Sequence, residues 1–174
     1  MATSTSIRKP LYYSVLAYED WSMHFAAVDE GLCFVGSHNQ PFDELAEWAG
    51  RRMPAFDLVR DDDVMRLYTE ELIRYLQGEL KQFTLPLYYQ GTPFQEAVWG
   101  ALCCIPYGET RSYSDIAGDI QKPSAVRAVG AAIGANPILI TVPCHRVVGK
   151  NGSLTGYRGG MEMKKKLLTL ERSI

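Results

Sequence analysis

A cysteine and a histidine stand side by side in an apolar segment near the C-terminal end of the chain. Residues 138–148 read ILITVPCHRVV, which places Cys144 directly before His145. A thiolate is a strong, soft nucleophile and imidazole titrates near neutral pH, so the pair supplies a nucleophile and a proton acceptor. Glu171, near the end of the last predicted helix, is a candidate for the group that orients the imidazole.

Other interpretations of this pair stay open at the level of residue types. Cys144 also fits a small core residue, with His145 as a buried, hydrogen-bonded histidine. A Cys–His pair would also suit a cysteine hydrolase, although no oxyanion-hole turn is recognisable in the sequence. A helix-turn-helix regulator could sense oxidants or alkylating agents through Cys144.

The chain after residue 91 carries strong signals for helix starts. Thr92, Pro93 and Gln95 combine an N-cap, a first-turn proline and a capping-box partner, which predicts a helix that runs to about residue 104. Ser112 predicts the start of a short helix over 113–119. A last helix is expected over 161–172.

A second short helix is expected to begin at Pro123 and to end at Asn136-Pro137, so the two short helices have the outline of a helix-turn-helix. Its only charged residue is Arg127. Its other side chains are mostly small: Ala125, Ala128, Gly130, Ala131, Ala132 and Gly134. Tight packing explains some of them, whereas a helix lying in the minor groove of DNA, with Arg127 entering the base stack, explains the whole set.

The first half predicts a small antiparallel sheet covered by helices. β-forming residues fill 11–35, and 41–53 and 62–80 predict two helices. The apolar face of the second helix comprises Val64, Leu67, Tyr68, Leu72, Tyr75 and Leu76. With a linker at 83–93, these patterns predict an α+β fold, whose domains are 1–88 and a mostly helical 89–174 that contains the helix-turn-helix.

Charge is distributed unevenly along the 174-residue chain. The net charge is -2, but residues 1–90 carry 8 Lys+Arg against 14 Asp+Glu, and residues 91–174 carry 10 against 6. The second half could therefore face phosphates, although such imbalances are also common on ordinary protein surfaces. The opening segment is polar, and the four cysteines show neither C-x-x-C spacing nor a disulfide framework. These features predict a cytosolic protein with reduced thiols.

Several short motifs of the second half form a specific combination. They are PCHRVV at 143–148, GSLTGYRGG at 152–160, MKKKLLTLER at 163–172, SY at 112–113 and RAVG at 127–130. This combination resembles the O6-alkylguanine-DNA alkyltransferases, also called methylated-DNA–protein-cysteine methyltransferases. The resemblance covers about residues 92–171, and it implies DNA repair by direct, irreversible transfer of an alkyl group from O6-alkylguanine, and from O4-alkylthymine, to Cys144. It also implies a ribonuclease-H-like form for the first half.

The resemblance assigns a role to each residue around the cysteine. Cys144 would accept the alkyl group, His145 would act as base through a bound water, and Glu171 would hydrogen-bond His145. Asn136 would tie the DNA-binding helix to the active-site loop. Tyr113 would rotate the 3′ phosphate and donate a proton toward the leaving base.

The resemblance also predicts the residues that contact the DNA and the flipped base. Arg127 would take the vacated place in the base stack, and the other DNA contacts would be Ser112, Tyr113, Ala125, Ala128 and Gly130. The pocket would comprise Ile133, Pro143, Val147, Tyr157 and Arg158. Within it, the carbonyls of Cys144 and Val147 would read the exocyclic amine and the backbone N–H of Arg158 would approach O6. Some relatives carry a small polar residue where Arg158 stands, so its side chain receives no role.

The implied partner is double-stranded DNA that contains alkylated guanine, bound through the minor groove by a monomer, with no cofactor and no membrane. Some relatives hold a structural zinc in the first domain, but His24, Cys33 and His38 match no ligand spacing, so we expect no metal. A non-catalytic relative that only binds the lesion is a further alternative, although such proteins lack the acceptor cysteine.

The expected product is a thioether, which has no activated leaving group, so each molecule should react once. We expect a moderately lowered pKa for Cys144, because extreme depression would weaken the nucleophile. Alkyl uptake should be lost below about pH 5, where histidine and thiol are both protonated.

Overall fold

The computed structural model describes residues 7–172 of the chain. The start of the polar opening segment and the outer limits of the two predicted domains lie outside the described residues. The elements, in chain order, are β1 (Lys9–Tyr18), β2 (Trp21–Val28), β3 (Gly31–Val35), α1 (Phe42–Arg52), β4 (Phe56–Arg60), α2 (Arg66–Leu76), α3 (Pro93–Cys103), β5 (Arg111–Ser112), α4 (Tyr113–Asp119), α5 (Val126–Gly134), the 3-10 helix η1 (Cys144–Arg146), β6 (Val147–Val148) and α6 (Met161–Arg172).

The N-terminal sheet has the strand order β3-β2-β1-β4. The pairs β1–β2 and β2–β3 are antiparallel, which confirms the predicted antiparallel pairing over residues 11–35. Strand β4 was not predicted from the sequence; it pairs in parallel with β1 and makes the sheet mixed. Its sequence FDLVR alternates apolar and polar residues only over its first three positions, so β4 gives a weak strand signal.

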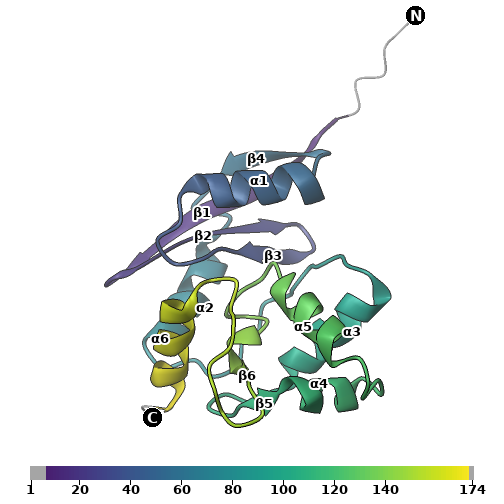
Figure 1. Cartoon of the computed structure of the whole chain (residues 1–174). Helices are drawn as coiled ribbons and strands as arrows, with labels where there is room; N and C mark the ends of the chain where they lie inside the picture. Colours follow the sequence, from purple (N-terminus) through teal and green to yellow (C-terminus); the bar gives the residue numbers. More distant parts are fainter. Residues whose placement is uncertain (1–6, 173–174) are drawn as a thin grey trace, which may run out of the picture.

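The two faces of this sheet pack against different parts of the molecule. On one face, Leu11, Ala26 and Phe34 pack with Leu45 and Ala49 of α1. The other face contributes to a larger core that also contains side chains of α2, α3, α5 and α6. In Figure 1 the sheet and α1 form the upper layer, and the helical half lies beneath them. The fold is therefore α+β, as expected.

The second N-terminal helix is shorter than predicted. Helix α2 spans Arg66–Leu76, because Asp61 Oδ1 accepts hydrogen bonds from the amides of Asp63 and Val64 and forms a separate turn before it. The predicted apolar face is only partly correct. Leu72, Tyr75 and Leu76 are buried, whereas Val64 and Leu67 are exposed to solvent.

The helix signals of the second half are largely confirmed. Thr92 and Gln95 form a capping box at the start of α3, and Ser112 caps α4 in the same way with Asp115. Helix α6 has the predicted bounds. Helix α5 begins at Val126 rather than at Pro123, because the Ala125 amide bonds to the carbonyl of Lys122 and closes a turn first.

One edge of the sheet holds both the linker and the segment that leads to Cys144. Leu32 of β3 donates its amide to Pro86, and the carbonyl of Leu32 accepts from Tyr88. Further along β3, Val35 pairs in the same way with Pro137 and Leu139. The N-terminal sheet therefore fixes the backbone that enters the active-site segment.

A two-stranded parallel sheet, absent from the sequence predictions, joins two distant parts of the second half. In it Arg111 pairs with Val147 and Ser112 pairs with Val148. This pairing sets the start of α4 beside the chain that leaves the Cys-His segment (Figure 1). Among residues 7–172, no helix has the length and apolar character needed to cross a bilayer.

Candidate active site

Cys144 begins the short helix η1 and is only 2% exposed. The amide Nδ2 of Asn136 donates to its sulfur at 3.2 Å. Burial raises the pKa of the Cys144 thiol, and the Asn136 hydrogen bond offsets this only in part. The expected lowering of this pKa is therefore wrong, and the thiol is held in its neutral form.

Asn136 is fully buried and joins the end of α5 to the active-site segment. Besides the sulfur, its Nδ2 donates to the carbonyls of Val142 at 3.0 Å and Ile138 at 3.3 Å. Its Oδ1 accepts from the amide of Ile138 at 2.9 Å. The side chain thus uses both its donor and its acceptor within the segment.

His145 and Glu171 are in direct contact in the buried interior. Nε2 of His145 lies 2.6 Å from Oε2 of Glu171. The same oxygen accepts from the Tyr75 hydroxyl at 2.5 Å. Arg146 donates to Oε1 from Nε at 2.9 Å, and the amide of Gly108 donates to Oε1 at 3.1 Å. Glu171 is therefore held by four partners that come from different parts of the chain.

These contacts set the protonation of the network. Burial alone would raise the pKa of Glu171, but the hydrogen bonds from His145, Arg146 and Tyr75 hold this pKa well below its ordinary range. Burial lowers the pKa of His145, and the hydrogen bond to Glu171 opposes the shift. A neutral imidazole therefore faces an ionised carboxylate.

The geometry also decides which nitrogen of His145 can accept a proton. Because Nε2 faces the carboxylate, Nε2 carries the hydrogen and Nδ1 has the free lone pair. Nδ1 is buried and has no hydrogen-bond partner among the described residues. His145 thus presents an unused acceptor next to Cys144 in the chain.

Cys144 lines a cavity of about 270 Å³. It is lined by Tyr113, Gly130, Ile133, Gly134, Cys144, Gly156, Tyr157 and Arg158. Helices α4 and α5 thus form one wall, and the loop after β6 forms the other. The structure brings Ile133, Tyr157 and Arg158 into the pocket predicted for them, and it adds Tyr113 and Gly130, which were predicted as DNA contacts.

Two of the predicted pocket residues do not line this cavity. Pro143 lines a separate cavity together with Arg146, because the chain turns at Pro143 and Cys144 and their side chains enter different spaces. Val147 is fully buried, and its carbonyl accepts a hydrogen bond from Lys164 Nζ at 2.7 Å. Pro143 and Val147 therefore do not line this cavity, and their contact with the flipped base stays a prediction.

The predicted DNA-contacting residues follow the outer side of α4 and α5. Arg127 and Ala128 are exposed, and Ser112 and Ala125 are half-buried. Tyr113 connects this surface to the cavity, where its hydroxyl lies 2.7 Å from the Thr155 hydroxyl. Its ring lies 3.9 Å from where a Cβ on Gly130 would stand, so the two helices approach closely at this point.

The side chain of Arg158, to which the sequence assigned no role, donates hydrogen bonds to three backbone carbonyls. Nε donates to Asn136 at 2.9 Å, and Nη2 donates to Val35 at 2.9 Å and to Pro137 at 3.3 Å. The guanidinium also lies 5.5 Å from the ring centroid of Phe34. Arg158 thereby links β3, the end of α5 and the wall of the cavity.

Comparisons with known proteins match both halves of the chain to one family. Residues 11–89 match the model of the 6-O-methylguanine DNA methyltransferase ribonuclease-like domain, and residues 93–173 match the model of the DNA binding domain of the same protein. The inducible methylated-DNA–protein-cysteine methyltransferase of Bacillus subtilis (strain 168) is 64% identical over 93% of this chain and 90% of its own length. The chain belongs to the O6-alkylguanine-DNA alkyltransferase family.

Solved alkyltransferase structures agree with this assignment. The Mycobacterium tuberculosis OGT in complex with DNA superimposes with a TM-score of 0.81 at 40% identity, covering 93% of each chain. The enzyme from Pyrococcus kodakaraensis KOD1 gives a TM-score of 0.70 at 29% identity, covering 92% of this chain and 98% of its own.

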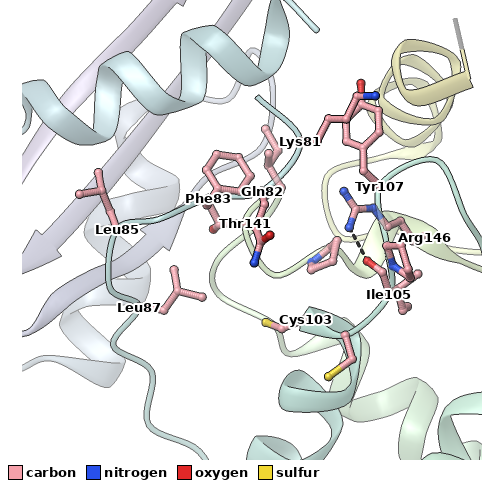
Figure 2. A pocket seen from close by; sticks show the side chains of 14 residues that line it. Lys81, Gln82, Phe83, Leu85, Leu87, Cys103, Ile105, Tyr107, Thr141 and Arg146 are labelled. Atoms are coloured by element: carbon pink, nitrogen blue, oxygen red, sulfur yellow. Dashed lines mark hydrogen bonds between the residues drawn. The ribbon is translucent and has the colours of Figure 1, made fainter. Parts of the chain in front are cut away.

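Sequence reasoning missed three polar residues of this alkyltransferase site. Tyr75 and Arg146 hold Glu171, and Arg146 is anchored in turn by the carbonyl of Ile105 at 2.6 Å (Figure 2). Lys164 is 1% exposed and donates to Val147 and Thr155. A charged residue inside an apolar pattern, as Arg146 and Lys164 are, was the available signal, whereas Tyr75 gave none because tyrosine is ordinary on an apolar helix face.

No metal site emerges from the described part of the chain. Within residues 7–172, no three His, Cys, Asp or Glu side chains are grouped closely enough to hold an ion. His38 Nδ1 accepts from the Ser22 amide, and the thiol of Cys33 faces the carbonyl of Ala26. These two side chains are therefore engaged in separate local contacts.

Proposed function

We propose that this chain transfers an alkyl group from the O6 atom of guanine in DNA to the sulfur of Cys144, once per molecule and without a cofactor. The observation that carries the proposal is the position of Cys144, which lines a cavity of about 270 Å³ between α5 and the loop after β6 and is followed in the chain by His145. The same site would also take O4-alkylthymine. The protein would act as a monomer.

The first step is the removal of the thiol proton. Nδ1 of His145 would receive this proton through one bound water, and Glu171 would stabilise the imidazolium through Nε2. Since burial keeps the resting thiol neutral, the thiolate would form only as it attacks. The Asn136 amide, which already donates to the sulfur, would favour that charge.

The second step forms the bond between sulfur and carbon and breaks the bond between carbon and O6. The electron pair of the broken bond stays on the base, which takes up a proton from Tyr113 and leaves as guanine. In-line attack requires the base to be held against the sulfur with water excluded, and the largely apolar lining of the cavity favours this arrangement. The thioether has no activated leaving group, so the reaction ends there.

The base must leave the DNA stack to reach the cavity. We infer that α5 lies in the minor groove, because its exposed side chains are small and Arg127 is the charge at its start. Arg127 would occupy the gap in the stack, which offsets the few kcal/mol of unstacking. Tyr113, at the rim of the cavity, would turn the neighbouring phosphate.

The test mixes the protein with a duplex that carries O6-methylguanine and locates the added mass by peptide mapping. We expect one methyl group per chain, confined to the peptide of Cys144, and no further repair once the protein is used up. Cys144→Ala should lose methyl uptake but keep its binding to the lesion. Repeated turnover, or binding of the lesion by the native protein without any mass change, would refute the proposal.

A further inference from the structure

A second and larger cavity, of about 590 Å³, lies between the linker and the end of α3. Pro143 and Arg146 line it, whereas Cys144 lines the alkyl-transfer cavity instead. Figure 2 shows Cys103, Tyr107 and Arg146 around this space, with Leu85 and Leu87 on the linker. The proposed alkyl transfer makes no use of it.

Two thiols stand next to each other on the wall of this cavity. Cys103 is the last residue of α3 and Cys104 is its C-cap, and both line the cavity. Their Cα atoms are about 3.8 Å apart, as in any trans peptide. Both are exposed, whereas Cys33 and Cys144 are buried. The chain thus offers one accessible pair of neighbouring thiols.

The part of the cavity beside the linker is suited to an apolar group. Phe83, Leu85 and Leu87 of the linker line it together with the two cysteines. A ligand bound to both sulfurs could therefore place a hydrocarbon substituent against these side chains and remove their surface from water. A bare ion would leave this part of the cavity without a partner.

We propose that Cys103 and Cys104 form a dithiol site for a monosubstituted arsenic(III) compound, R–As(OH)₂, with R in the apolar part of the cavity. Two sulfur–arsenic bonds form and two arsenic–oxygen bonds break. Each leaving hydroxide takes the proton of one thiol, so two waters are released and arsenic stays trivalent.

The Cys103 thiol is neutral near physiological pH. Although Cys103 reaches the solvent, partial desolvation by the surrounding wall raises the pKa of its thiol to about 11. Oxidation and disulfide exchange need a thiolate, so this thiol reacts slowly by those routes near neutral pH. The condensation with R–As(OH)₂ consumes neutral thiols and needs no oxidant.

Binding of the arsenic compound should also affect the residues proposed to carry out alkyl transfer. The carbonyl of Ile105, the residue after Cys104, accepts the 2.6 Å hydrogen bond from Arg146, which in turn holds Glu171. Drawing the two sulfurs together at the end of α3 would shift this carbonyl. Slower alkyl uptake follows, and this consequence alone rests on the proposed function.

The experiment adds phenylarsine oxide to the intact chain without DNA and measures the mass under non-denaturing conditions. We expect one phenylarsenic group per chain, held against excess monothiol and removed by a dithiol such as 2,3-dimercaptopropanol. Cys103→Ser and Cys104→Ser should each weaken retention about a hundredfold, because the second thiol no longer acts within the same molecule. Cys144→Ser should bind as the native chain does, which separates this site from the alkyl acceptor.

Alkyl uptake by the two serine variants without the arsenical shows that they fold. Retention by either serine variant at the native level, or failure of the native chain to bind, would overturn the proposal. A native chain that binds arsenic but transfers no alkyl group would leave this site standing and refute only the proposed function.

Discussion

The side-chain amide of Asn136 lies 3.2 Å from the sulfur of Cys144 and also donates to the carbonyl of Val142. One buried side chain thus ties the end of α5 to Cys144. Asn136→Ala should lower the free energy of unfolding by about 2–4 kcal/mol, because several buried partners lose their hydrogen bonds. The rate of alkyl uptake should also fall in this variant. Urea titration measures the free energy of unfolding, and single-turnover kinetics measure the rate of alkyl uptake. Asn151→Ala, at an exposed position, is the control. If the two variants behaved equally, Asn136 would not hold the site together.

The pH dependence of alkyl uptake should follow His145. The pKa of its imidazole is lowered from 6.5 by burial, so His145 stays neutral and able to accept a proton as the pH falls through 6.5. The rate should therefore hold at pH 6.5 and fall only in more acidic solution, as the pH passes the lowered pKa. Single-turnover rates across this range test the expectation, and a midpoint at or above pH 6.5 would contradict it.

The stability of the fold should fall in acid for the same structural reason. The pKa values of His145 and Glu171 are both lower in the folded chain than their ordinary 6.5 and 4.5, so the unfolded chain binds more protons. Their stabilisation is present above those ordinary values and is lost as the pH falls below them. Urea midpoints from pH 7 downward measure this loss. In Glu171→Gln the urea midpoint should change less steeply with pH. An unchanged pH dependence would show that Glu171 does not contribute to it.

Tyr75→Phe should weaken the network without removing any ring contact. The variant loses the hydroxyl that donates to Glu171 at 2.5 Å, at a cost of about 1.5–3 kcal/mol for a hydrogen bond to a charged group. We also expect slower alkyl uptake, because Glu171 then holds His145 less firmly. Thermal unfolding and single-turnover rates provide the readout. Native stability in this variant would show that the hydroxyl is dispensable.

Arg127→Ala should separate DNA engagement from chemistry. The exposed side chain lies on α5 and outside the cavity lining, so transfer from a free O6-benzylguanine base should stay native. Repair of a lesion in duplex DNA should slow by about tenfold or more, because the extruded base loses its replacement in the stack. Arg74→Ala, an exposed arginine of α2, serves as the charge control. Equal loss on base and duplex would place Arg127 in the chemistry instead.

Arg158→Lys should be nearly as harmful as Arg158→Ala. A lysine is a single point donor and cannot span the carbonyls of Val35, Asn136 and Pro137, which the planar guanidinium reaches together. Both variants should lose about 1–3 kcal/mol of stability, since the carbonyl of Asn136 loses the hydrogen bond from Nε and the carbonyls of Val35 and Pro137 keep only their backbone partners. Urea unfolding of the two variants in parallel decides the matter, and full rescue by lysine would show that only the positive charge counts.

Local signals in the sequence determined those parts of the fold that depend on neighbouring residues. The cap at Thr92 and Gln95 acts over three residues, and the bounds of α6 follow from its own amphipathic pattern. The PCHRVV motif similarly identified the family and the pair Cys144–His145, because these residues are adjacent in the chain.

Only the tertiary structure decided what depends on contacts between distant segments. Tyr75 and Glu171 are 96 residues apart, and no pattern within α2 shows that one of its apolar positions carries a functional hydroxyl. Three other features also depend on contacts between distant segments. They are the parallel pairing of β4 with β1, the exposure of Leu67, and the turn that places Pro143 and Cys144 in different cavities. Each is set by which surfaces meet when the chain packs, and that choice is made by the whole core rather than by any one segment.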